Sequence, residues 1–348
     1  MIQMFKQKYT PISVVWESTL ECNMNCIHCG ASAGFKRRNE LTTREAKTVI
    51  DDLNRLGTKL ITLMGGEPFL RKDWYTIAKY IREKKMNITI MSNGSLINEK
   101  IVKKLEKLQP YAMAISLDGG TAETHDKIRR VDDSFNHCLE SLKLLRNAGI
   151  QTSVVTTVHK QNVKELPLIR DLLLNKGIAW QIQMCTPVGR FPRDLMLSKK
   201  EFYATALFIA STRRKYNRKQ LPIMGAHNFG YHSEYMPNIM LFPWTGCQAG
   251  ISTLGIQSDG GIQGCLSLPD NYVEGNIRQQ RITDIWNNSN SFSYNRKCNP
   301  KEMNGECAQC KYKKRCKGGC LTAAVSISRE EHNDPYCLRL IEKDIQKI

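Results

Sequence analysis

The sequence has no run of 18 or more apolar residues, and its first eight residues lack the apolar stretch of a signal peptide. A transmembrane helix needs about 20 apolar residues, so none is expected, and nothing marks the chain for export. We therefore expect a cytoplasmic protein without a membrane partner. The chain also lacks internal repeats and low-complexity tracts. With 41% hydrophobic residues, its composition is not that of a disordered protein.

Acidic residues are outnumbered by basic ones, because 33 Asp and Glu stand against 51 Lys and Arg, a net charge of +18. Such an excess favours acidic partners, for which an acidic peptide and nucleic acid are both candidates. A generic basic surface accounts for the charge equally well. The densest basic stretches are residues 213–219 and 311–317, and cysteines are interleaved with the second.

Cysteine is abundant, with 13 in 348 residues. In a chain without a signal peptide, metal binding explains such a number better than disulfides do. The odd count and the tight spacing of several cysteines also favour metal ligands over disulfide pairs.

The first half of the chain alternates β-rich runs with amphipathic segments. Strands are expected at residues 13–16, 59–64, 88–91, 112–117, 152–158 and 180–184, and helices at residues 43–56, 74–84, 99–108, 135–148 and 163–175. This alternation predicts a parallel sheet with right-handed crossovers. Six β/α units fall short of the eight in a closed barrel. We expect an α/β fold with a partial, open (β/α)6 barrel like a TIM barrel, and ligands at the C-terminal ends of its strands.

The pattern changes after residue 186. Residues 187–246 contain one expected helix, 199–216, and are interpreted as a bridging region. Residues 247–348 are rich in Cys, Gly, Asn and Lys and show little regular periodicity. Because such a segment buries little apolar surface, metal clusters are expected to hold it together. The predicted organisation is therefore a barrel over 1–186, a bridge over 187–246 and a small, cysteine-rich and loop-rich domain over 247–348.

Cys22, Cys26 and Cys29 follow the first expected strand, with three and two residues between them. Three thiolates on one short loop can hold three irons of a 4Fe–4S cube and leave the fourth iron free for a small molecule. Zinc also accepts thiolates, but a structural zinc site usually takes four ligands in pairs. The spacing therefore favours an iron–sulfur cluster.

This three-cysteine loop at the end of the first strand resembles that of the radical S-adenosylmethionine (SAM) superfamily, whose fold is a partial (β/α)6 barrel. The resemblance implies that the free iron chelates SAM. It also implies that an electron from the reduced cluster cleaves SAM to methionine and a 5′-deoxyadenosyl radical, which abstracts a hydrogen atom from the substrate. An electron donor such as flavodoxin or ferredoxin is then expected as a partner.

Motifs at the ends of successive strands add to the resemblance. Residues 65–68 match the superfamily's GGEP turn, whose glycines let the backbone approach a ligand closely. In the superfamily, Glu67 accepts from the methionine ammonium of SAM, Arg129 lies near its carboxylate, and His28 lies next to the adenine. Residues at the ends of the third and fourth strands resemble ribose-side contacts. The full set of expected SAM contacts is His28, Gly65, Gly66, Glu67, Pro68, Ser92, Asn93, Ser116, Asp118 and Arg129.

Seven further cysteines lie near the C-terminus, and their spacing resembles the SPASM domain, which carries auxiliary iron–sulfur clusters beside a radical SAM barrel. When the ligand pattern of the SPASM domain is transferred to this chain, the resemblance implies an outer cluster bound by Cys307, Cys310, Cys316 and Cys337. It implies an inner cluster bound by Cys247, Cys265 and Cys320. Together with the first site, this implies three 4Fe–4S clusters.

The inner cluster lacks a fourth cysteine, because residues 238–246 contain none. An open iron, Cys298 and a non-cysteine ligand are the candidates for that position. A zinc-ribbon-like module is the alternative to SPASM clusters, but it leaves Cys247 and Cys265 unexplained.

Three residues outside these sets lie at positions that bear on the core or the site. Cys138 falls within an expected helix and is most simply a buried small hydrophobe. Cys185 follows the sixth strand, where its thiol could donate a hydrogen atom to a substrate radical or simply pack in the pocket wall. Glu17 lies on the first strand, where it could contact substrate, accept a proton or serve a structural hydrogen bond.

Enzymes with SPASM domains mostly modify peptides, so the resemblance implies a peptide maturase that cross-links, oxidises or epimerises a precursor peptide. The basic charge would suit an acidic precursor. The first cysteine stands at residue 22, without a preceding leader-binding module, so a separate recognition protein is expected. Leu266 follows Cys265, where sulfatase-maturing relatives place an Asp as a base, and this argues against sulfatase maturation.

Two other activities are alternatives to peptide maturation. The runner-up acts on a small molecule, such as a tetrapyrrole side chain or an aminoglycoside-like substrate. The third modifies RNA and is motivated by the charge, but known RNA-modifying relatives generally lack the seven-cysteine domain, so nucleic acid is not the expected partner.

Overall fold

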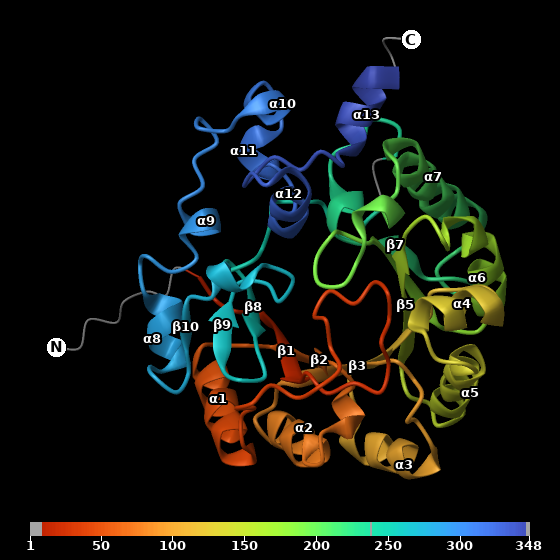
Figure 1. The fold of residues 1–348 in the computed structure, drawn as a ribbon, viewed down its shortest axis with the longest axis vertical. Coiled ribbons are helices and arrows are strands. Elements are labelled where there is room, and N and C mark those ends of the chain that lie inside the picture. Colours follow the sequence, from red (N-terminus) through yellow and green to blue (C-terminus); the bar gives the residue numbers. More distant parts are fainter. Residues whose placement is uncertain (1–8, 237–238, 346–348) are drawn as a thin grey trace.

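A ten-stranded sheet forms the centre of the computed structural model, which describes residues 9–236 and 239–345 (Figure 1). Its strand order is β10-β9-β8-β1-β2-β3-β4-β5-β6-β7. The strands from β8 to β7 are parallel, whereas β9 and β10 pair antiparallel. The strands are β1 (Ser13–Thr19), β2 (Leu60–Gly65), β3 (Asn87–Ser92), β4 (Ala112–Ser116), β5 (Thr152–Val158), β6 (Ala179–Met184), β7 (Ile223–Gly225), β8 (Thr253–Ile256), β9 (Gly261–Gln263) and β10 (Gly275–Asn276).

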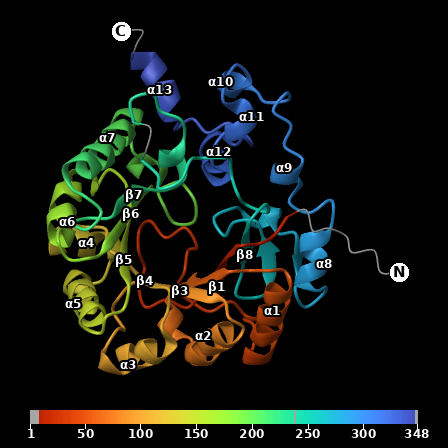
Figure 2. The same ribbon diagram turned by 180° about the vertical axis from the view of Figure 1, so that it is seen from behind.

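Helices surround the outside of the curved sheet, and the C-terminal segment lies across the open side of the barrel (Figure 1). The helices are α1 (Thr43–Arg55), α2 (Trp74–Glu83), α3 (Glu99–Leu108), α4 (Ala122–Arg129), α5 (Ser134–Asn147), α6 (Leu166–Leu173), α7 (Lys199–Lys215), α8 (Ile282–Asn287), α9 (Ser293–Arg296), α10 (Gly305–Ala308), α11 (Lys313–Cys316), α12 (Leu321–Ser328) and α13 (Leu338–Ile345). Seen from behind, α13 lies beside the end of α7 (Figure 2). Among the described residues, no helix has both the length and the apolar character to cross a bilayer.

The six predicted β/α units are confirmed, and the six strands lie within three residues of their predicted bounds. Local sequence explains this agreement. The Thr42 hydroxyl accepts from the Glu45 amide at 3.3 Å, and the Glu45 carboxylate accepts from the Thr42 amide at 2.8 Å. This capping box begins α1 at the predicted residue.

Three features differ from the sequence-based expectation. Helix α4 was not predicted, because it has only eight residues and most of them are polar. The predicted helix 163–175 is a 3-10 turn over 163–165 followed by α6. The sheet has more than six strands. Strand β7, from the bridging region, pairs with β6, and strand β8, from the cysteine-rich segment, pairs with β1. These added strands have two to four residues, too few for a recognisable alternation.

The core is continuous from the barrel into the C-terminal segment. Trp180 on β6 and Trp286 on α8 are both buried, and each indole N–H donates to a partner, the Thr156 hydroxyl at 2.8 Å and the Tyr9 carbonyl at 3.1 Å. Leu254 on β8 pairs with Val14 on β1, and both side chains are fully buried. The C-terminal domain is therefore built onto the barrel sheet.

Replacing Leu254 with Ala should destabilise both parts together. Loss of a fully buried leucine costs about 2–5 kcal/mol, whereas Leu207→Ala on the exposed face of α7 should change the free energy of unfolding by less than about 0.5 kcal/mol. Anaerobic denaturant titration measures both values. Equal, small effects would mean that β8 is not part of the cooperative core.

Candidate active site at the mouth of the barrel

A cavity of about 280 Å³ lies at the C-terminal ends of the strands. It is enclosed by the loop after β1, by the ends of β2, β3, β4 and β6, and by residues of the C-terminal domain. The residues singled out from sequence that line it are Glu17, Cys22, Cys26, His28, Cys29, Gly65, Gly66, Ser92, Asn93, Ser116, Arg129, Cys185, Cys265 and Cys320. Three expected contacts, Glu67, Pro68 and Asp118, are absent from this lining.

The three-cysteine loop is fixed at both ends by backbone hydrogen bonds. The Cys22 amide donates to the Gly34 carbonyl at 2.9 Å, and the Ile27 amide donates to the Ile128 carbonyl of α4 at 3.0 Å. Burial raises the pKa of the Cys22 thiol to about 11, and the nearby Cys26 and Cys29 also raise it. Three thiols held this close together favour a bound cation, because only positive charge offsets their ionisation.

Glu67 lies behind the wall of the cavity and holds the neighbouring turn. One carboxylate oxygen accepts from the Ser92 hydroxyl at 2.9 Å and the Phe69 amide at 3.3 Å, and the other accepts from the Asn93 amide at 2.8 Å. The side chain is fully buried, and burial raises its pKa to about 7. In this structure Glu67 thus positions Ser92 and Asn93, which do line the cavity.

Asp118 is likewise buried behind the wall, at the end of β4. Its carboxylate forms an ion pair with Arg129, accepts from the Thr157 amide at 2.8 Å and lies 3.1 Å from His28 Nε2. Burial alone would raise the pKa of Asp118, but the charges of Arg129 and His28 outweigh burial and hold the pKa well below its usual range. Asp118 therefore orients two cavity-lining residues instead of reaching the cavity itself.

Each of the two side chains that Asp118 orients has one buried nitrogen without a hydrogen-bond partner among the described residues. These nitrogens are Arg129 Nε and His28 Nδ1, and both residues line the cavity. Buried polar groups are rarely left unpaired. The wall therefore fits a polar ligand such as SAM, which the resemblance implies.

Two of the three predicted inner-cluster cysteines line the same cavity. Cys265 and Cys320 line it, and Thr322 donates a hydrogen bond to Cys265 Sγ at 3.8 Å. Burial raises the pKa of the Cys265 thiol, and nearby Cys247 raises it further, so the three sulfurs are neighbours. The first and inner cysteine sets thus face one shared space.

The four predicted outer-cluster cysteines all line a second, small apolar cavity of about 30 Å³: Cys307, Cys310, Cys316 and Cys337. Burial, followed by the effect of Cys337, raises the pKa of the Cys316 thiol to about 12. Arg339 Nη1 donates to Cys310 Sγ at 3.5 Å. The residues therefore fit a group that binds four thiolates.

Sulfur spacing distinguishes a cluster from a single ion. Within residues 9–236 and 239–345, no three cysteine, histidine or carboxylate side chains converge tightly enough to hold one metal ion. A zinc ion needs all of its sulfurs about 2.3 Å from one point, whereas a 4Fe–4S cube accepts thiolates at separate corners. The described residues therefore show no ready-made site for a single ion, and the choice between clusters and a zinc-ribbon-like module stays a prediction.

The remaining cysteines lie apart from these sets. Cys138 is fully buried in α5 and donates to the Asn93 carbonyl at 3.2 Å, as expected for a core position. Cys298 lines a separate polar cavity with Tyr294, Glu302 and His332, and none of the inner-cluster cysteines lines that cavity. The structure does not bring Cys298 to the inner set.

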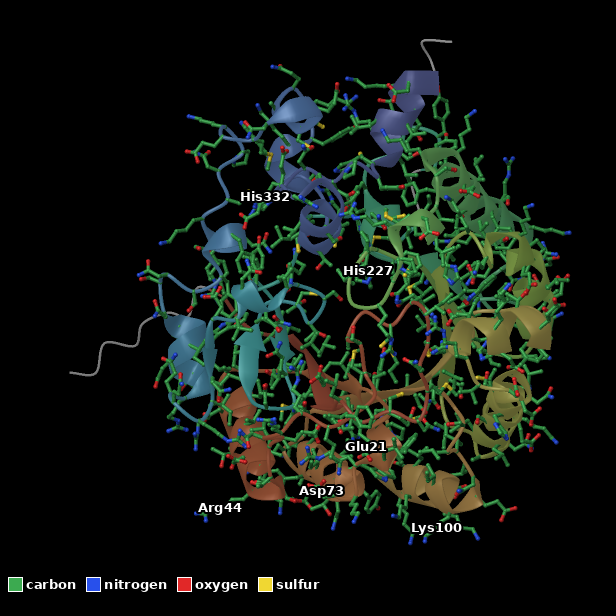
Figure 3. All side chains as sticks on the ribbon, in the orientation of Figure 1. Glu21, Arg44, Asp73, Lys100, His227 and His332 are labelled. Carbon is green, nitrogen blue, oxygen red and sulfur yellow. The ribbon has the colours of Figure 1, made fainter. Side chains whose placement is uncertain are left out.

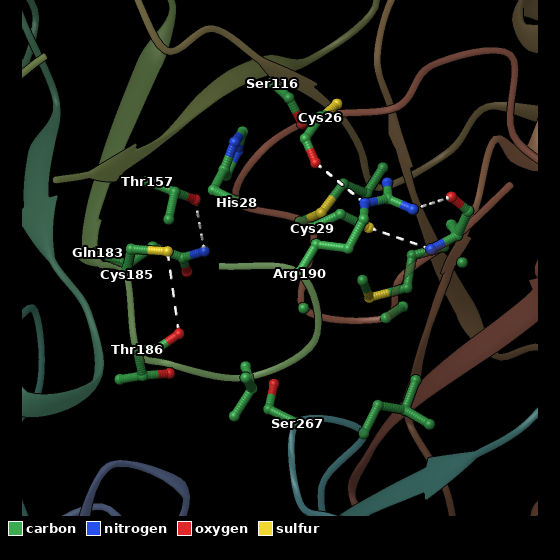
Figure 4. A pocket seen from close by; sticks show the side chains of 18 of the residues that line it. Cys26, His28, Cys29, Ser116, Thr157, Gln183, Cys185, Thr186, Arg190 and Ser267 are labelled. Carbon is green, nitrogen blue, oxygen red and sulfur yellow. Dashed lines mark hydrogen bonds between the residues drawn. The ribbon is translucent and has the colours of Figure 1, made fainter. Parts of the chain in front are cut away.

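Cys185 and Glu17 both line the main cavity, and Figure 4 shows Cys185 next to Gln183 and Thr186. The Cys185 side chain is buried, and burial raises its pKa well above the ordinary value, so the thiol keeps its proton. The Glu17 carboxylate accepts from Arg37 Nε at 2.8 Å and from the Ser258 hydroxyl at 2.8 Å. These contacts join β1 to the turn after β8 and agree with the structural role considered for Glu17.

Sequence reasoning missed two basic residues of the cavity wall, Arg190 and His227. Arg190 follows β6 in a loop without periodicity. His227 follows β7 with a φ of +54°, near the centre of the molecule (Figure 3). Burial lowers its pKa, which favours a neutral imidazole. The unusual feature of His227 is its left-handed backbone conformation shortly after a strand. This conformation is known only from the structure, so no sequence pattern marks the residue.

Acidification should destabilise the folded chain, because His125, which lies next to Asp118 behind the cavity, is buried in its neutral form. His125 Nδ1 accepts from the Asp118 amide at 3.2 Å, and burial followed by the Arg129 charge lowers its pKa to about 4. Below pH 6.5 the unfolded chain therefore binds a proton that the folded chain refuses. The free energy of unfolding should fall by about 1.4 kcal/mol per pH unit from this residue, until the pH reaches about 4.

Denaturant titrations between about pH 7 and pH 5 measure this slope. His125→Asn keeps an acceptor without a titrating group and should reduce the measured slope by about 1.4 kcal/mol per pH unit, while the contribution of His159, whose pKa is also lowered to about 4, remains. His137→Asn, at an exposed position of α5, should leave it unchanged. Parallel curves for the His125 variant and the wild type would refute the assignment.

Comparison with known proteins identifies the two domains. The family model of the Radical SAM superfamily matches residues 16–173, and that of an iron–sulfur cluster-binding domain, SPASM, matches residues 247–311. The AdoMet-dependent heme synthase of Methanosarcina barkeri is 31% identical over 341 residues, which are 94% of this chain and 96% of that protein. The mycofactocin maturase MftC of Mycobacterium tuberculosis is 27% identical over 94% of this chain and 83% of its own.

The fold agrees with a solved structure as well. The crystal structure of Streptococcus suis SuiB bound to S-adenosylmethionine superposes with a TM-score of 0.76 at 18% identity, covering 94% of this chain and 76% of SuiB. Such a likeness shows the shared fold, a partial barrel followed by a cluster-binding domain. From the full-length similarity and the two matched domains, it follows that this chain belongs to the radical SAM superfamily and is a radical SAM enzyme with a C-terminal SPASM domain.

Proposed function

We propose that this enzyme abstracts a hydrogen atom from a side chain of a precursor peptide and so installs a cross-link, an oxidation or an epimerised centre. The observation that carries the proposal is the narrow cavity between two sets of cysteines. Its volume of about 280 Å³ is close to the lower end of the usual range for a ligand pocket. Because SAM also needs room there, the cavity suits one inserted side chain of a larger molecule.

Three 4Fe–4S clusters are part of this proposal. Cys22, Cys26 and Cys29 would hold the first one. The outer auxiliary cluster would be held by Cys307, Cys310, Cys316 and Cys337, and the inner one by Cys247, Cys265 and Cys320. When bound and reduced, the first cluster supplies the electron that cleaves SAM to methionine and a 5′-deoxyadenosyl radical.

The cavity residues would bind and orient SAM. The hydroxyls of Ser92 and Ser116 and the amide of Asn93 line the wall on the side expected for the ribose. The unpaired Nε of Arg129 suits a carboxylate. A Cβ on Gly66 would lie 2.0 Å from the Glu21 carbonyl, so the turn after β2 requires glycine at this position.

Two residues have proposed roles toward the substrate. Cys185 keeps a protonated thiol at the cavity wall, which suits donation of a hydrogen atom to a substrate radical and hence epimerisation. Glu17, though bound to Arg37 and Ser258, also lines the cavity, and its role as a proton acceptor stays a prediction.

Known proteins support a peptide substrate without deciding it. MftC is named a maturase, and SuiB has been crystallised with its precursor peptide SuiA. A tetrapyrrole side chain is the second candidate, favoured by the 31% identity to a heme synthase. A propionate on a macrocycle also fits a narrow cavity whose wall includes Arg190 and His227.

Iron analysis tests the cluster assignment. Anaerobically reconstituted enzyme should hold about twelve irons, because each of three cubes holds four. Replacement of Cys22, Cys26 and Cys29 by Ala should lower this to about eight and abolish 5′-deoxyadenosine release. Cys138→Ala and Cys298→Ser are matched controls that should retain all of the iron. About four irons together with zinc would overturn the three-cluster assignment.

Substrate trials separate the two candidate activities. The enzyme is incubated with SAM, dithionite and either a candidate precursor peptide or an iron coproporphyrin, and products are analysed by mass spectrometry. Peptide maturation predicts a peptide lacking hydrogen, or one that gains solvent deuterium at unchanged connectivity, and Cys185→Ala should abolish only the latter. Formation of heme from the porphyrin, with the peptides unchanged, would instead establish the second candidate.

A further inference from the structure

The loop after β6 holds the three-cysteine loop through one residue, Arg190. Its amide donates to the Cys29 carbonyl at 3.0 Å, its Nε donates to the Cys26 carbonyl at 3.2 Å, and its Nη1 donates to the Ala33 carbonyl at 2.6 Å. Figure 4 shows the Arg190 side chain beside Cys26 and Cys29 at the cavity wall. A single side chain and its own amide thus fix three points of the cysteine loop.

The preceding residue allows this close approach. Gly189 has a φ of +58°, and a Cβ there would lie 2.3 Å from the Cys29 carbonyl and 2.4 Å from the Gly30 carbonyl. Only glycine can adopt this conformation at such a distance without displacing the cysteine loop. The backbone of the β6 loop is therefore packed directly against the backbone of the cysteine loop.

The charge of Arg190 is not neutralised by a carboxylate. No ion pair joins Arg190 to an acidic side chain within the part of the chain that the structure describes, and its Nη2 is buried without a partner there. A guanidinium beside Cys26 and Cys29 leaves positive charge where an anionic cluster would bind. Unpaired buried donors cost free energy, so a bound anionic group would stabilise this arrangement.

We propose that Arg190 is a positioning residue that sets the geometry of the three-cysteine loop and raises the reduction potential of the cluster bound there. The potential of an iron–sulfur cluster depends on nearby charge and hydrogen bonding. Positive charge favours the reduced, more negative form. The inference rests on the proposed binding of the first cluster by Cys22, Cys26 and Cys29, and it is independent of which substrate the enzyme uses.

Arg193 provides a matched control in the same loop region. It also donates to backbone carbonyls, those of Ser326 and of Ile327 at 3.4 Å, but these belong to α12 and not to the cysteine loop. Arg193→Gln therefore removes the same charge and a similar pair of hydrogen bonds away from the proposed cluster.

The test is a redox titration of the anaerobically reconstituted full chain, followed by electron paramagnetic resonance. The first cluster is identified as the one whose signal changes when SAM is added. Arg190→Gln should shift its potential to a more negative value or cost the chain up to four irons. Arg190→Lys, which keeps the charge, should restore most of the potential or the iron. Arg193→Gln should match the wild type.

Two results would overturn the proposal. One is a wild-type potential and iron content in Arg190→Gln. The other is an equal shift in Arg193→Gln, which would trace the effect to overall charge. Failure of the cluster assignment itself would appear separately, as a wild-type chain without a SAM-sensitive signal.

Discussion

Strand β1 is the element on which both parts of the molecule depend. It pairs in parallel with β2 on one side and with β8 on the other, so the barrel and the SPASM domain share a sheet. Because β1 leads into the three-cysteine loop and β8 leads through β9 to Cys265, this pairing brings two sets of thiols to one cavity. Buried Glu17 reinforces the seam by bonding to Arg37 and Ser258. Backbone hydrogen bonding, not a flexible linker, thus sets the separation of the two sets.

Buried carboxylates behind the cavity form a second layer of organisation. Glu67 holds Ser92 and Asn93 in place, and Asp118 holds Arg129. Sequence motifs place both acids at strand ends but do not say which way their side chains point. The direction of each carboxylate depends on hydrogen-bond donors from other elements. In this structure such donors bind the carboxylates of both Glu67 and Asp118. In this structure Glu67 and Asp118 therefore position residues that line the cavity, and their own contact with a ligand stays a prediction.

The barrel could be predicted from the sequence because each β/α unit is long enough to show its period. The cysteine sets could be assigned because their spacing along the chain resembles that of a known family. Strands β7 to β10 were missed because two to four residues show no alternation. Arg190 was missed because its partner Cys26 lies 164 positions away, and no local pattern marks a contact between two irregular loops. His227 was missed because its place in the cavity wall depends on how β7 joins β6.

The shape of the cavity bears on how a substrate would be selected. A peptide side chain and a tetrapyrrole propionate are both flexible groups on a larger body, so a narrow cavity accepts either one. Discrimination between a peptide and a macrocycle must then arise from residues around the cavity entrance and on the outer surface of the protein. With a net charge of +18 the whole surface favours acidic partners, a property that acidic peptides and carboxylate-bearing macrocycles share. Under the proposed function, the cavity would select the reacting group, and contacts outside it would decide which molecule presents that group.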